Sequence, residues 1–313
     1  YEIDDCQDYD IVKAMFAPST HERLELFHKR FGGYWRFGNI KDYCYLVNPY
    51  FPTEAMINKM KYFYDKLLFN YPSGQSIERI CACRMFDNVS DDNILIGNGA
   101  AELINNLKYI VGKKIALTIP SFNEYVRCFP NSEITYINSK DDNYRLSLNK
   151  LKETLNKVDT LIVISPDNPS GSHLKYGEVI ELLDMAKEMD KQVIFDESFI
   201  DFANDSYTLI NDDILKKYPN LIVIKSISKS YGVPGLRLGV LASGNYEYLD
   251  IINRNMPVWN INSFAEYFLQ IFLIYKKDYV YGCSKIKEER NRFYNELIKI
   301  SELDVYDSEA NYF

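Results

Sequence analysis

A lysine flanked by hydroxyls and glycines is the feature of this sequence that could carry covalent chemistry. It lies in Ser226–Gly239, which reads Ser-Ile-Ser-Lys-Ser-Tyr-Gly-Val-Pro-Gly-Leu-Arg-Leu-Gly. The lysine is Lys229, and Arg237 follows eight residues later. Hydroxyls and a guanidinium bind anions, and glycines let the main chain approach them, so the segment could form an anion site beside an amine. A loop lysine can also be only a solvated charge, and the neighbouring motifs decide between these interpretations.

Three further segments place polar residues directly after apolar runs. Gly97–Glu102 could bring main-chain amides to an anion at a helix N-terminus, or it could simply start a helix, and Glu102 occupies the third-glycine position of a dinucleotide loop. Ser165–Gly171 has the composition of a turn, but its Asn168 could also donate to a ligand. Asp196 ends an apolar run, where a carboxylate is costly unless a helix cap, a salt bridge or a bound cation compensates it.

The apolar runs before these segments predict strands. They are short, rich in β-branched residues and alternate with stretches of helical period. The predicted strands are Asn93–Ile96, Lys114–Ile119, Ile134–Ile137, Thr160–Ser165, Gln192–Phe195, Leu221–Ser226 and Leu238–Ala242. The predicted helices are Ala100–Val111, Asn149–Lys157 and Tyr176–Asp190. This alternation indicates an α/β fold with a mostly parallel sheet flanked by helices, whose ligand site lies beyond the carboxyl ends of the strands.

The sequence divides into three predicted parts. Residues 1–70 would form an N-terminal arm that contributes to a small domain, with an arm or partial helix around Glu22–Phe31. Residues 71–245 would form the large domain, and residues 246–313 a smaller α+β domain. The last part contains two helical patterns and a predicted strand, at Ser263–Lys277, Tyr279–Ile300 and Leu303–Tyr306. A further strand would begin at Ala310–Phe313, where the sequence stops.

Composition excludes several classes of function. The 313 residues carry a net charge of −8, which argues against a nucleic acid or an anionic membrane as partner. No apolar run approaches the ~20 residues that cross a bilayer, and the first residues lack a signal-peptide pattern. Of six cysteines only Cys81 and Cys83 are close, and no second pair or histidine cluster completes a metal site. The sequence therefore predicts a cytoplasmic protein with free thiols and no metal.

Taken in order, the four motifs resemble those of one enzyme family. From Asn93 to Gly239 the sequence resembles the fold-type-I pyridoxal-phosphate enzymes, most closely their histidinol-phosphate aminotransferase and threonine-phosphate decarboxylase branch. The resemblance implies the fold of these transferases and an aminotransferase that moves an amino group between an amino acid and an oxo acid or phosphorylated carbonyl compound. A threonine-phosphate-like decarboxylase and a non-catalytic cofactor-binding module are the alternatives. An oxidoreductase built on Gly97–Glu102 is disfavoured, because the following strand ends Thr-Ile-Pro-Ser without an acidic residue.

The resemblance also implies roles for individual residues. Lys229 would bind pyridoxal 5'-phosphate as a Schiff base and later shuttle a proton at the substrate Cα. Asp196 would pair with the pyridine nitrogen and keep it protonated. Asn168 would donate to the phenolic oxygen of the ring, and Phe122 would stack on the ring. Where many relatives have a tyrosine, Phe199 lacks the hydroxyl that would also bind the phenolic oxygen.

The resemblance implies that groups from three segments hold the cofactor phosphate. They are Gly99 with the main-chain amides of Ala100 and Ala101, the side chains of Ser226 and Ser228, and the guanidinium of Arg237. Tyr71, in Asn-Tyr-Pro, matches a tyrosine that reaches the phosphate from the partner subunit, which implies a homodimer.

Both ends of the sequence lead to expectations about the whole protein. Relatives continue past Ala310–Phe313 with the arginine that binds the substrate carboxylate, so we expect either a fragment or an enzyme without that site. Tyr1–Asp5 resembles the tail of a sugar-phosphate or choline-phosphate nucleotidyltransferase, which favours a nucleotidyltransferase–aminotransferase fusion. Because the carboxylate site decides which Cα bond breaks, the sequence leaves transamination and decarboxylation open.

Overall fold

The computed structural model describes residues 3, 6–30, 32–37, 41, 43 and 46–313. The chain divides into two compact units, Tyr1–Leu46 and Val47–Phe313. The first unit contains α1 (Cys6–Met15), α2 (Thr20–His28) and a short 3-10 turn, η1 (Tyr34–Arg36). The Ser19 hydroxyl caps α2 by accepting from the Glu22 amide at 3.2 Å, and α2 overlaps the stretch predicted as an arm or partial helix. Tyr1–Asp5, on which the nucleotidyltransferase resemblance rests, lies outside the described residues except for Ile3.

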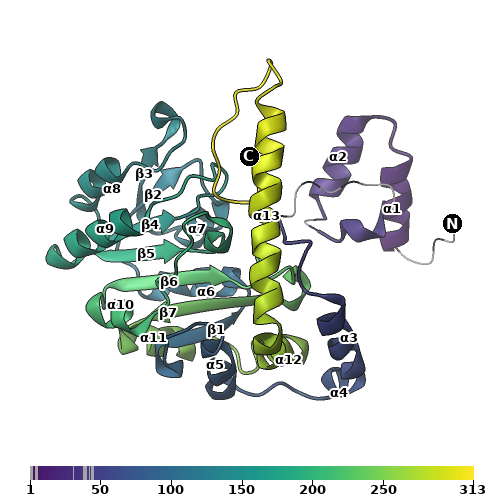
Figure 1. The fold of residues 1–313 in the computed structure, drawn as a ribbon, viewed down its shortest axis with the longest axis horizontal. Helices are drawn as coiled ribbons and strands as arrows, with labels where there is room; N and C mark the ends of the chain where they lie inside the picture. The colour runs from purple at the N-terminus through teal and green to yellow at the C-terminus, as the bar shows by residue number, and fades with distance from the viewer. Residues whose placement is uncertain (1–2, 4–5, 31, 38–40, 42, 44–45) are drawn as a thin grey trace. The chain divides into compact units, whose positions relative to one another are not determined.

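A seven-stranded mixed sheet organises the second unit (Figure 1). Its strand order is β1-β7-β6-β5-β4-β2-β3. The strands are β1 (Ile94–Asn98), β2 (Lys114–Ile119), β3 (Glu133–Asn138), β4 (Thr160–Ile164), β5 (Gln192–Asp196), β6 (Leu221–Ser226) and β7 (Leu238–Ser243). Only β7 runs antiparallel to its neighbours, so β1 follows the direction of the remaining strands. All the predicted strands of the large domain form within two residues of their expected ends, and the mostly parallel α/β sheet is confirmed.

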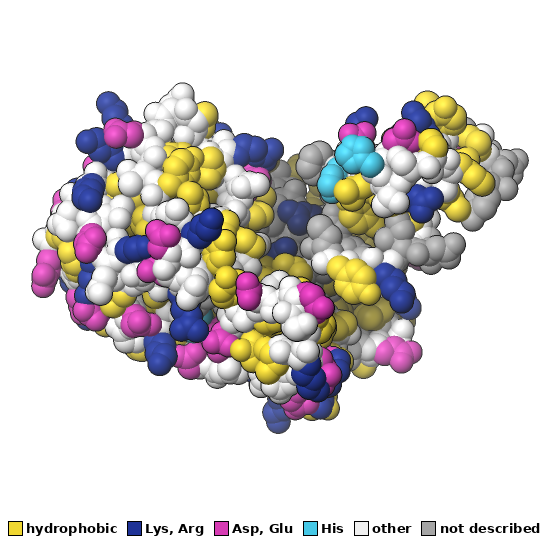
Figure 2. All heavy atoms as spheres, turned by 90° about the horizontal axis from the view of Figure 1, so that it is seen from above, with side chains coloured by type: hydrophobic (Ala, Val, Ile, Leu, Met, Phe, Trp, Pro, Cys, Tyr) yellow, Lys and Arg dark blue, Asp and Glu magenta, His cyan; other side chains and the backbone are white. Residues whose placement is uncertain are grey.

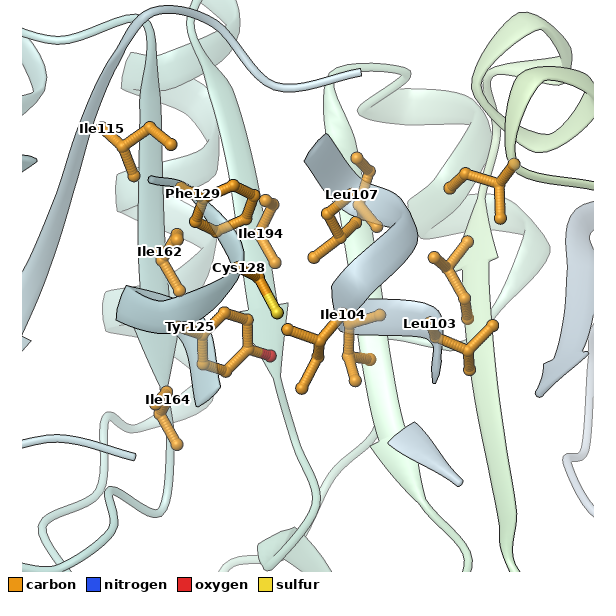
Figure 3. Packing of buried hydrophobic residues seen from close by; sticks show 14 of the residues in the cluster. Leu103, Ile104, Leu107, Ile115, Tyr125, Cys128, Phe129, Ile162, Ile164 and Ile194 are labelled. Atoms are coloured by element: carbon orange, nitrogen blue, oxygen red, sulfur yellow. The ribbon is translucent and has the colours of Figure 1, made fainter. Parts of the chain in front are cut away.

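Helices cover both faces of the sheet because its strands are apolar on both faces. On one face, α6 (Ala100–Asn106), α7 (Asn123–Cys128) and α11 (Tyr246–Arg254) pack onto the cluster that contains Ile162 and Ile194. Figure 3 shows the α7 side chains Tyr125 and Cys128 over these isoleucines. On the other face lie α8 (Leu148–Leu155) and α9 (Tyr176–Glu188).

The remaining helices surround the sheet and its loops. They are α3 (Glu54–Tyr62), α4 (Tyr64–Phe69), α5 (Gln75–Cys83), α10 (Asp212–Lys217), α12 (Ser263–Ile271) and α13 (Lys276–Leu297). Short 3-10 turns are η2 (Asp91–Asn93), η3 (Leu107–Tyr109), η4 (Lys140–Asp142), η5 (Ile200–Phe202), η6 (Pro234–Leu236) and η7 (Phe272–Tyr275). Two predicted helices end early, because 3-10 turns η3 and η7 replace their last turns. No described helix is long and apolar enough to span a membrane.

The strand predicted at Leu303–Tyr306 is wrong. This segment follows α13 as irregular chain, and the side chains of Leu303 and Tyr306 remain 48% and 42% exposed. The alternation of apolar residues is present, but no strand among the described residues hydrogen-bonds to it, and a strand requires a paired neighbour. Ala310–Phe313 does not form a strand either; it lies against loops of the large sheet.

Charged side chains of both signs are mixed on the face shown in Figure 2, where Lys and Arg side chains are interspersed with Asp and Glu. Such mixing gives this face no broad field of one sign.

Candidate functional site

The register of the sheet brings the predicted site segments to one edge. Asp196, the last residue of β5, lies opposite Ile164 of β4 and Ile224 of β6. Because these strands are parallel, the loops that carry Asn168 and Lys229 leave the sheet beside Asp196.

The antiparallel strand β7 connects the two predicted phosphate-binding segments. Its first residues, Leu238 and Gly239, lie opposite Asn98 of β1 and Ser226 of β6. A Cβ atom on Gly239 would collide with the main chain of Ala100, so only glycine lets the start of α6 approach β7 this closely. The loop after β1, the end of β6 and Arg237 therefore meet at one place.

The residues at this meeting point fit a bound phosphate. Gly99 has φ of +77°, and a Cβ atom there would occupy the position of the Arg237 guanidinium. The buried Ser228 hydroxyl has no hydrogen-bond partner among residues 46–313, as expected for a group that awaits a ligand. Ser226 is also buried, and its amide donates to Ser198 Oγ at 2.9 Å. The structure thus brings together a guanidinium, a spare hydroxyl and the loop that ends at Ala100 and Ala101.

A network of polar side chains fixes the end of β1 and the loop that follows it. The Gln75 side chain accepts from the Ile96 amide at 3.1 Å, and Asn260 Nδ2 donates to the Ile96 carbonyl at 2.9 Å. Asn260 also donates to Glu102 Oε2 at 2.9 Å, and Glu102 in turn accepts from the Asn98 amide at 2.6 Å. Glu102, which occupies the third-glycine position of a dinucleotide loop, therefore helps to fix the loop after β1.

Asp196 is held by two hydrogen bonds in an almost fully buried position. Tyr125 donates its hydroxyl to Asp196 Oδ2 at 2.8 Å, and the Ser198 amide donates to Oδ1 at 2.9 Å. Burial raises the pKa of Asp196 above its ordinary value, whereas these hydrogen bonds and the charge of Lys229 oppose the rise. A cation beside Asp196 would stabilise its buried negative charge.

Lys229 lies half-buried in the turn after β6, with its main chain fixed. Its carbonyl accepts from the Asn48 amide at 2.9 Å and from the Gly232 amide at 3.3 Å. Its Nζ atom lies 5.7 Å from the centre of the Phe199 ring, and Phe199 is itself buried. The amine thus lies near the Phe199 ring and close enough to Asp196 for its charge to act on that carboxylate.

Asn168 lies in a tightly hydrogen-bonded loop after β4. The preceding residue, Asp167, is 2% exposed, and burial raises its pKa to about 6 despite hydrogen bonds from Ser170. The Gly171 amide donates to the Asp167 carbonyl at 2.8 Å, and the Tyr312 hydroxyl donates to the same oxygen at 2.7 Å. Asn168 itself is partly exposed, so its side chain remains accessible to a ligand.

A cavity opens beside the Asn168 loop. Its volume is about 670 Å³, and it is lined mainly by apolar side chains: Pro120, Tyr144, Pro169, Phe293, Leu297, Leu303, Val305, Tyr306 and Phe313, with Ser170 and Asp304. A cavity of this size is within the range that holds small organic ligands.

Phe122 and Tyr71, two residues predicted to contact the cofactor, are exposed to solvent. Phe122 is 41% exposed at the start of α7, with its ring centre 6.5 Å from that of Tyr125. Tyr71 is 78% exposed between α4 and α5, and its ring stacks on Trp259 at 4.4 Å. The role of Tyr71 in a partner subunit stays a prediction.

Three residues of the site were missed in the sequence. Tyr125 bonds Asp196, Asn48 fixes the Lys229 main chain, and Tyr312 bonds the loop of Asn168. Each acts through hydrogen bonds that span a long sequence separation, and Asn48 makes two of them, to the carbonyls of Lys229 and Ser230. The spacing of Tyr125, three residues after Phe122, suits one helical turn but does not distinguish it from the other tyrosines of the sequence.

Comparison with known proteins gives consistent matches. A family model described as aminotransferase class I and II matches residues 42–313. An L-serine phosphate decarboxylase of Campylobacter jejuni is 35% identical over 298 residues, which cover 88% of this chain and 74% of that protein. The CMP-5'-(3-aminopropyl)phosphonate synthase of Streptomyces rubellomurinus is 29% identical over 316 residues, which cover 100% of this chain and 49% of the synthase. The chain thus spans about half the length of the synthase.

The fold is also found among solved structures. The histidinol-phosphate aminotransferase of Clostridium acetobutylicum has a TM-score of 0.76 at 28% sequence identity, covering 87% of this chain and 81% of that one. The likeness therefore extends over the sheet and its surrounding helices.

Proposed function

Because the chain belongs to the class I and II aminotransferase family, whose cofactor is pyridoxal phosphate, we propose that it acts on the Cα of an amino acid through Lys229. The observation that supports this proposal is that the Lys229 amine lies close enough to the buried Asp196 carboxylate, at the same edge of the sheet, for its charge to act on it. When bound, the cofactor supplies an electron sink for the charge that develops at Cα. Lys229 binds the cofactor and moves the proton at Cα.

The other residues hold and orient the cofactor. Asp196 keeps a proton on the ring nitrogen, since a cation there compensates its buried charge. Asn168 donates to the phenolic oxygen, Phe122 covers the ring, and the Phe199 ring lines the site near the Lys229 amine. The phosphate is bound by Gly99, Ala100, Ala101, Ser226, Ser228 and Arg237, with Tyr71 added from a partner subunit.

Two reactions at Cα are candidates, and the relatives favour decarboxylation of a phosphorylated amino acid. In that reaction the bond from Cα to the carboxylate breaks, carbon dioxide leaves, and Lys229 returns a proton to Cα. The identity of 35% to an L-serine phosphate decarboxylase supports it. Transamination, the first expectation from the sequence, is the second candidate and is supported by the likeness to a histidinol-phosphate aminotransferase.

An absorption spectrum tests the assignment of Lys229. Protein saturated with pyridoxal phosphate should show the visible band of the lysine-bound cofactor, and Lys229→Ala should lose that band. Lys217→Ala, which removes a half-exposed lysine paired with Asp184 at the end of α10, should retain the band. The proposal fails if wild-type protein shows no visible band at any cofactor concentration.

Product analysis separates the two reactions. With O-phospho-L-serine or O-phospho-L-threonine alone, decarboxylation releases carbon dioxide and leaves the amine in the product. Transamination instead produces a new amino acid only when a 2-oxo acid is added. Retained cofactor without either product would favour the non-catalytic module.

The proposal extends to the whole protein. We propose a homodimer in the cytoplasm, and a nucleotidyltransferase domain joined to this chain in the full-length protein. The coverage of about half of the Streptomyces synthase supports a further domain.

A further inference from the structure

The C-terminal segment Ser308–Tyr312 lies directly against the loop of Asn168. The Glu309 amide donates to the Gly171 carbonyl at 2.8 Å. A Cβ atom on Gly171 would collide with the Ser308 side chain, so only glycine permits this approach. The Tyr312 hydroxyl completes the contact by donating to the Asp167 carbonyl at 2.7 Å, on the residue that precedes Asn168.

A buried arginine fixes the same segment from the opposite side. Arg290 of α13 is 5% exposed and donates to the carbonyls of Phe202 and Ala310, at 2.7 and 3.1 Å. Its second nitrogen, Nη2, contacts Asn204 Oδ1 at 3.0 Å and Glu309 Oε2 at 3.2 Å. Glu309 also accepts from the Asn204 amide at 2.6 Å. A network anchored on the buried Arg290 therefore holds the segment that carries Tyr312.

The ring of Tyr312 reaches the other side of the site. It meets the Phe199 ring edge-on, with the ring centres 5.2 Å apart and an interplanar angle of 90°. The same Phe199 ring lies 5.7 Å from Lys229 Nζ. Burial raises the pKa of the Tyr312 hydroxyl well above its ordinary value, and the charges of Asp167 and Asp196 add to this rise, so the hydroxyl remains protonated and serves as a donor.

We propose that Tyr312 is a positioning residue that orients Asn168 toward the cofactor by holding the Asp167 carbonyl, an inference that rests on the proposed function. The peptide that joins Asp167 to Asn168 contains this carbonyl, so its orientation sets the direction in which the Asn168 side chain leaves the main chain. The Gly171 amide holds the same oxygen but belongs to the loop itself. Tyr312 ties the loop to a distant part of the chain and to the wall formed by Phe199.

Tyr312→Phe tests the proposal, because it removes the hydroxyl and keeps the ring. Its matched control is Tyr218→Phe, since the hydroxyl of the buried Tyr218 also donates a hydrogen bond, to Asp184 Oδ1 at 2.7 Å. In cofactor-free protein, Tyr312→Phe should speed amide hydrogen exchange in residues 167–171 about three- to tenfold, the range expected for loss of one hydrogen bond. Tyr218→Phe should leave exchange in these residues unchanged.

The cofactor gives two further readouts. Tyr312→Phe should weaken pyridoxal phosphate binding about three- to tenfold in an absorption titration. It should also shift the pH midpoint at which the visible band of the bound cofactor changes, whereas Tyr218→Phe should change neither quantity. Glu309→Gln, which weakens the network without touching Tyr312, should act in the same direction with a smaller effect.

The outcomes separate failure of this proposal from failure of the proposed function. Unchanged exchange in residues 167–171 overturns the positioning role, whether or not the protein binds the cofactor. Faster exchange with unchanged cofactor affinity and pH midpoint shows that Tyr312 holds the loop but does not position Asn168, and this also overturns the proposal. Absence of cofactor binding in wild type overturns the proposed function itself.

Discussion

Lys225 is a buried cation between two carboxylates, four residues before Lys229. Its Nζ atom lies 2.9 Å from Asp201 Oδ2 and 3.4 Å from Glu197 Oε1, and its side chain is 2% exposed. Burial alone would lower the pKa of Lys225, but the two carboxylates raise it above its ordinary value. Asp201 also accepts from the Ser230 hydroxyl at 2.9 Å, so this ion network is bonded to the residue that follows Lys229.

Lys225→Met should destabilise the protein strongly. The substitution leaves the carboxylate of Glu197 buried without a cation, a change that costs about 3–5 kcal/mol in comparable buried pairs. The free energy of unfolding, measured by urea denaturation, should fall by this amount. Lys217→Met removes a half-exposed partner of Asp184 and should change the free energy of unfolding little. Equal stabilities of the two variants would contradict the assignment of Lys225 as a buried, paired cation.

Single residues could be identified in the sequence when their chemistry conflicted with their surroundings. Asp196 was identifiable because a carboxylate at the end of an apolar strand needs compensation. Tyr125 was not, since it is one of 26 tyrosines and its hydrogen bond to Asp196 spans 71 residues. Tyr312 was inconspicuous for the same reason. A hydrogen bond between distant positions leaves no periodic trace in the sequence.

At the scale of elements, the loop between β1 and α6 depends on a single backbone conformation. Gly99 has φ of +77° and lies against the Arg237 guanidinium, as a residue with no side chain can. Gly235, in the neighbouring turn, has open space around it. The two glycines therefore provide a matched pair for substitution.

Gly99→Ala should weaken pyridoxal phosphate binding by about tenfold or more, because a left-handed non-glycine residue costs about 1–3 kcal/mol and displaces Arg237. Gly235→Ala should bind the cofactor like wild type. Absorption titration with pyridoxal phosphate measures both affinities. Equal affinities for the two variants would remove the loop after β1 from the phosphate site.

The strands of the large sheet were predictable because burial on both faces makes each strand a short apolar run bounded by turn residues. Their order was not, since β7 comes last in sequence and inserts between β1 and β6. At Leu303–Tyr306 the sequence pattern predicted a strand that does not form. Its pattern suits a strand, but pairing depends on a neighbour that the pattern cannot reveal.

At the scale of the whole molecule, exposed aromatic side chains gather on α3, α4 and the loop before α12. Tyr62 and Phe69 are 85% and 79% exposed, and Val258 is 79% exposed. The Tyr71 ring stacks on Trp259, and α3 and α4 both pack against α12, so these exposed side chains lie on neighbouring segments. Exposed apolar side chains on neighbouring segments are typical of an interface between protein chains.

The protein should sediment as a dimer, and Phe69→Glu should shift it toward monomer, because a buried unpaired charge opposes association. Tyr246→Glu, which changes an exposed residue at the start of α11, should remain dimeric. Analytical ultracentrifugation measures the association state of both variants. The monomeric variant should also bind pyridoxal phosphate more weakly, as Tyr71 would no longer reach a partner's site. A wild-type protein that sediments as a monomer would contradict the proposed homodimer.

The pairing of β1 with β7 also affects how the chain folds while it is synthesised on the ribosome. Ile94 pairs with Ala242, so β1 leaves the ribosome about 150 residues before its partner. At about 5–20 residues per second, roughly 7–30 s separate the synthesis of the two strands. During that interval β1 lacks β7, the strand with which it pairs in the sheet, and its unpaired main-chain groups can bind another nascent chain. The yield of folded enzyme in a cell therefore depends on shielding β1 while translation continues.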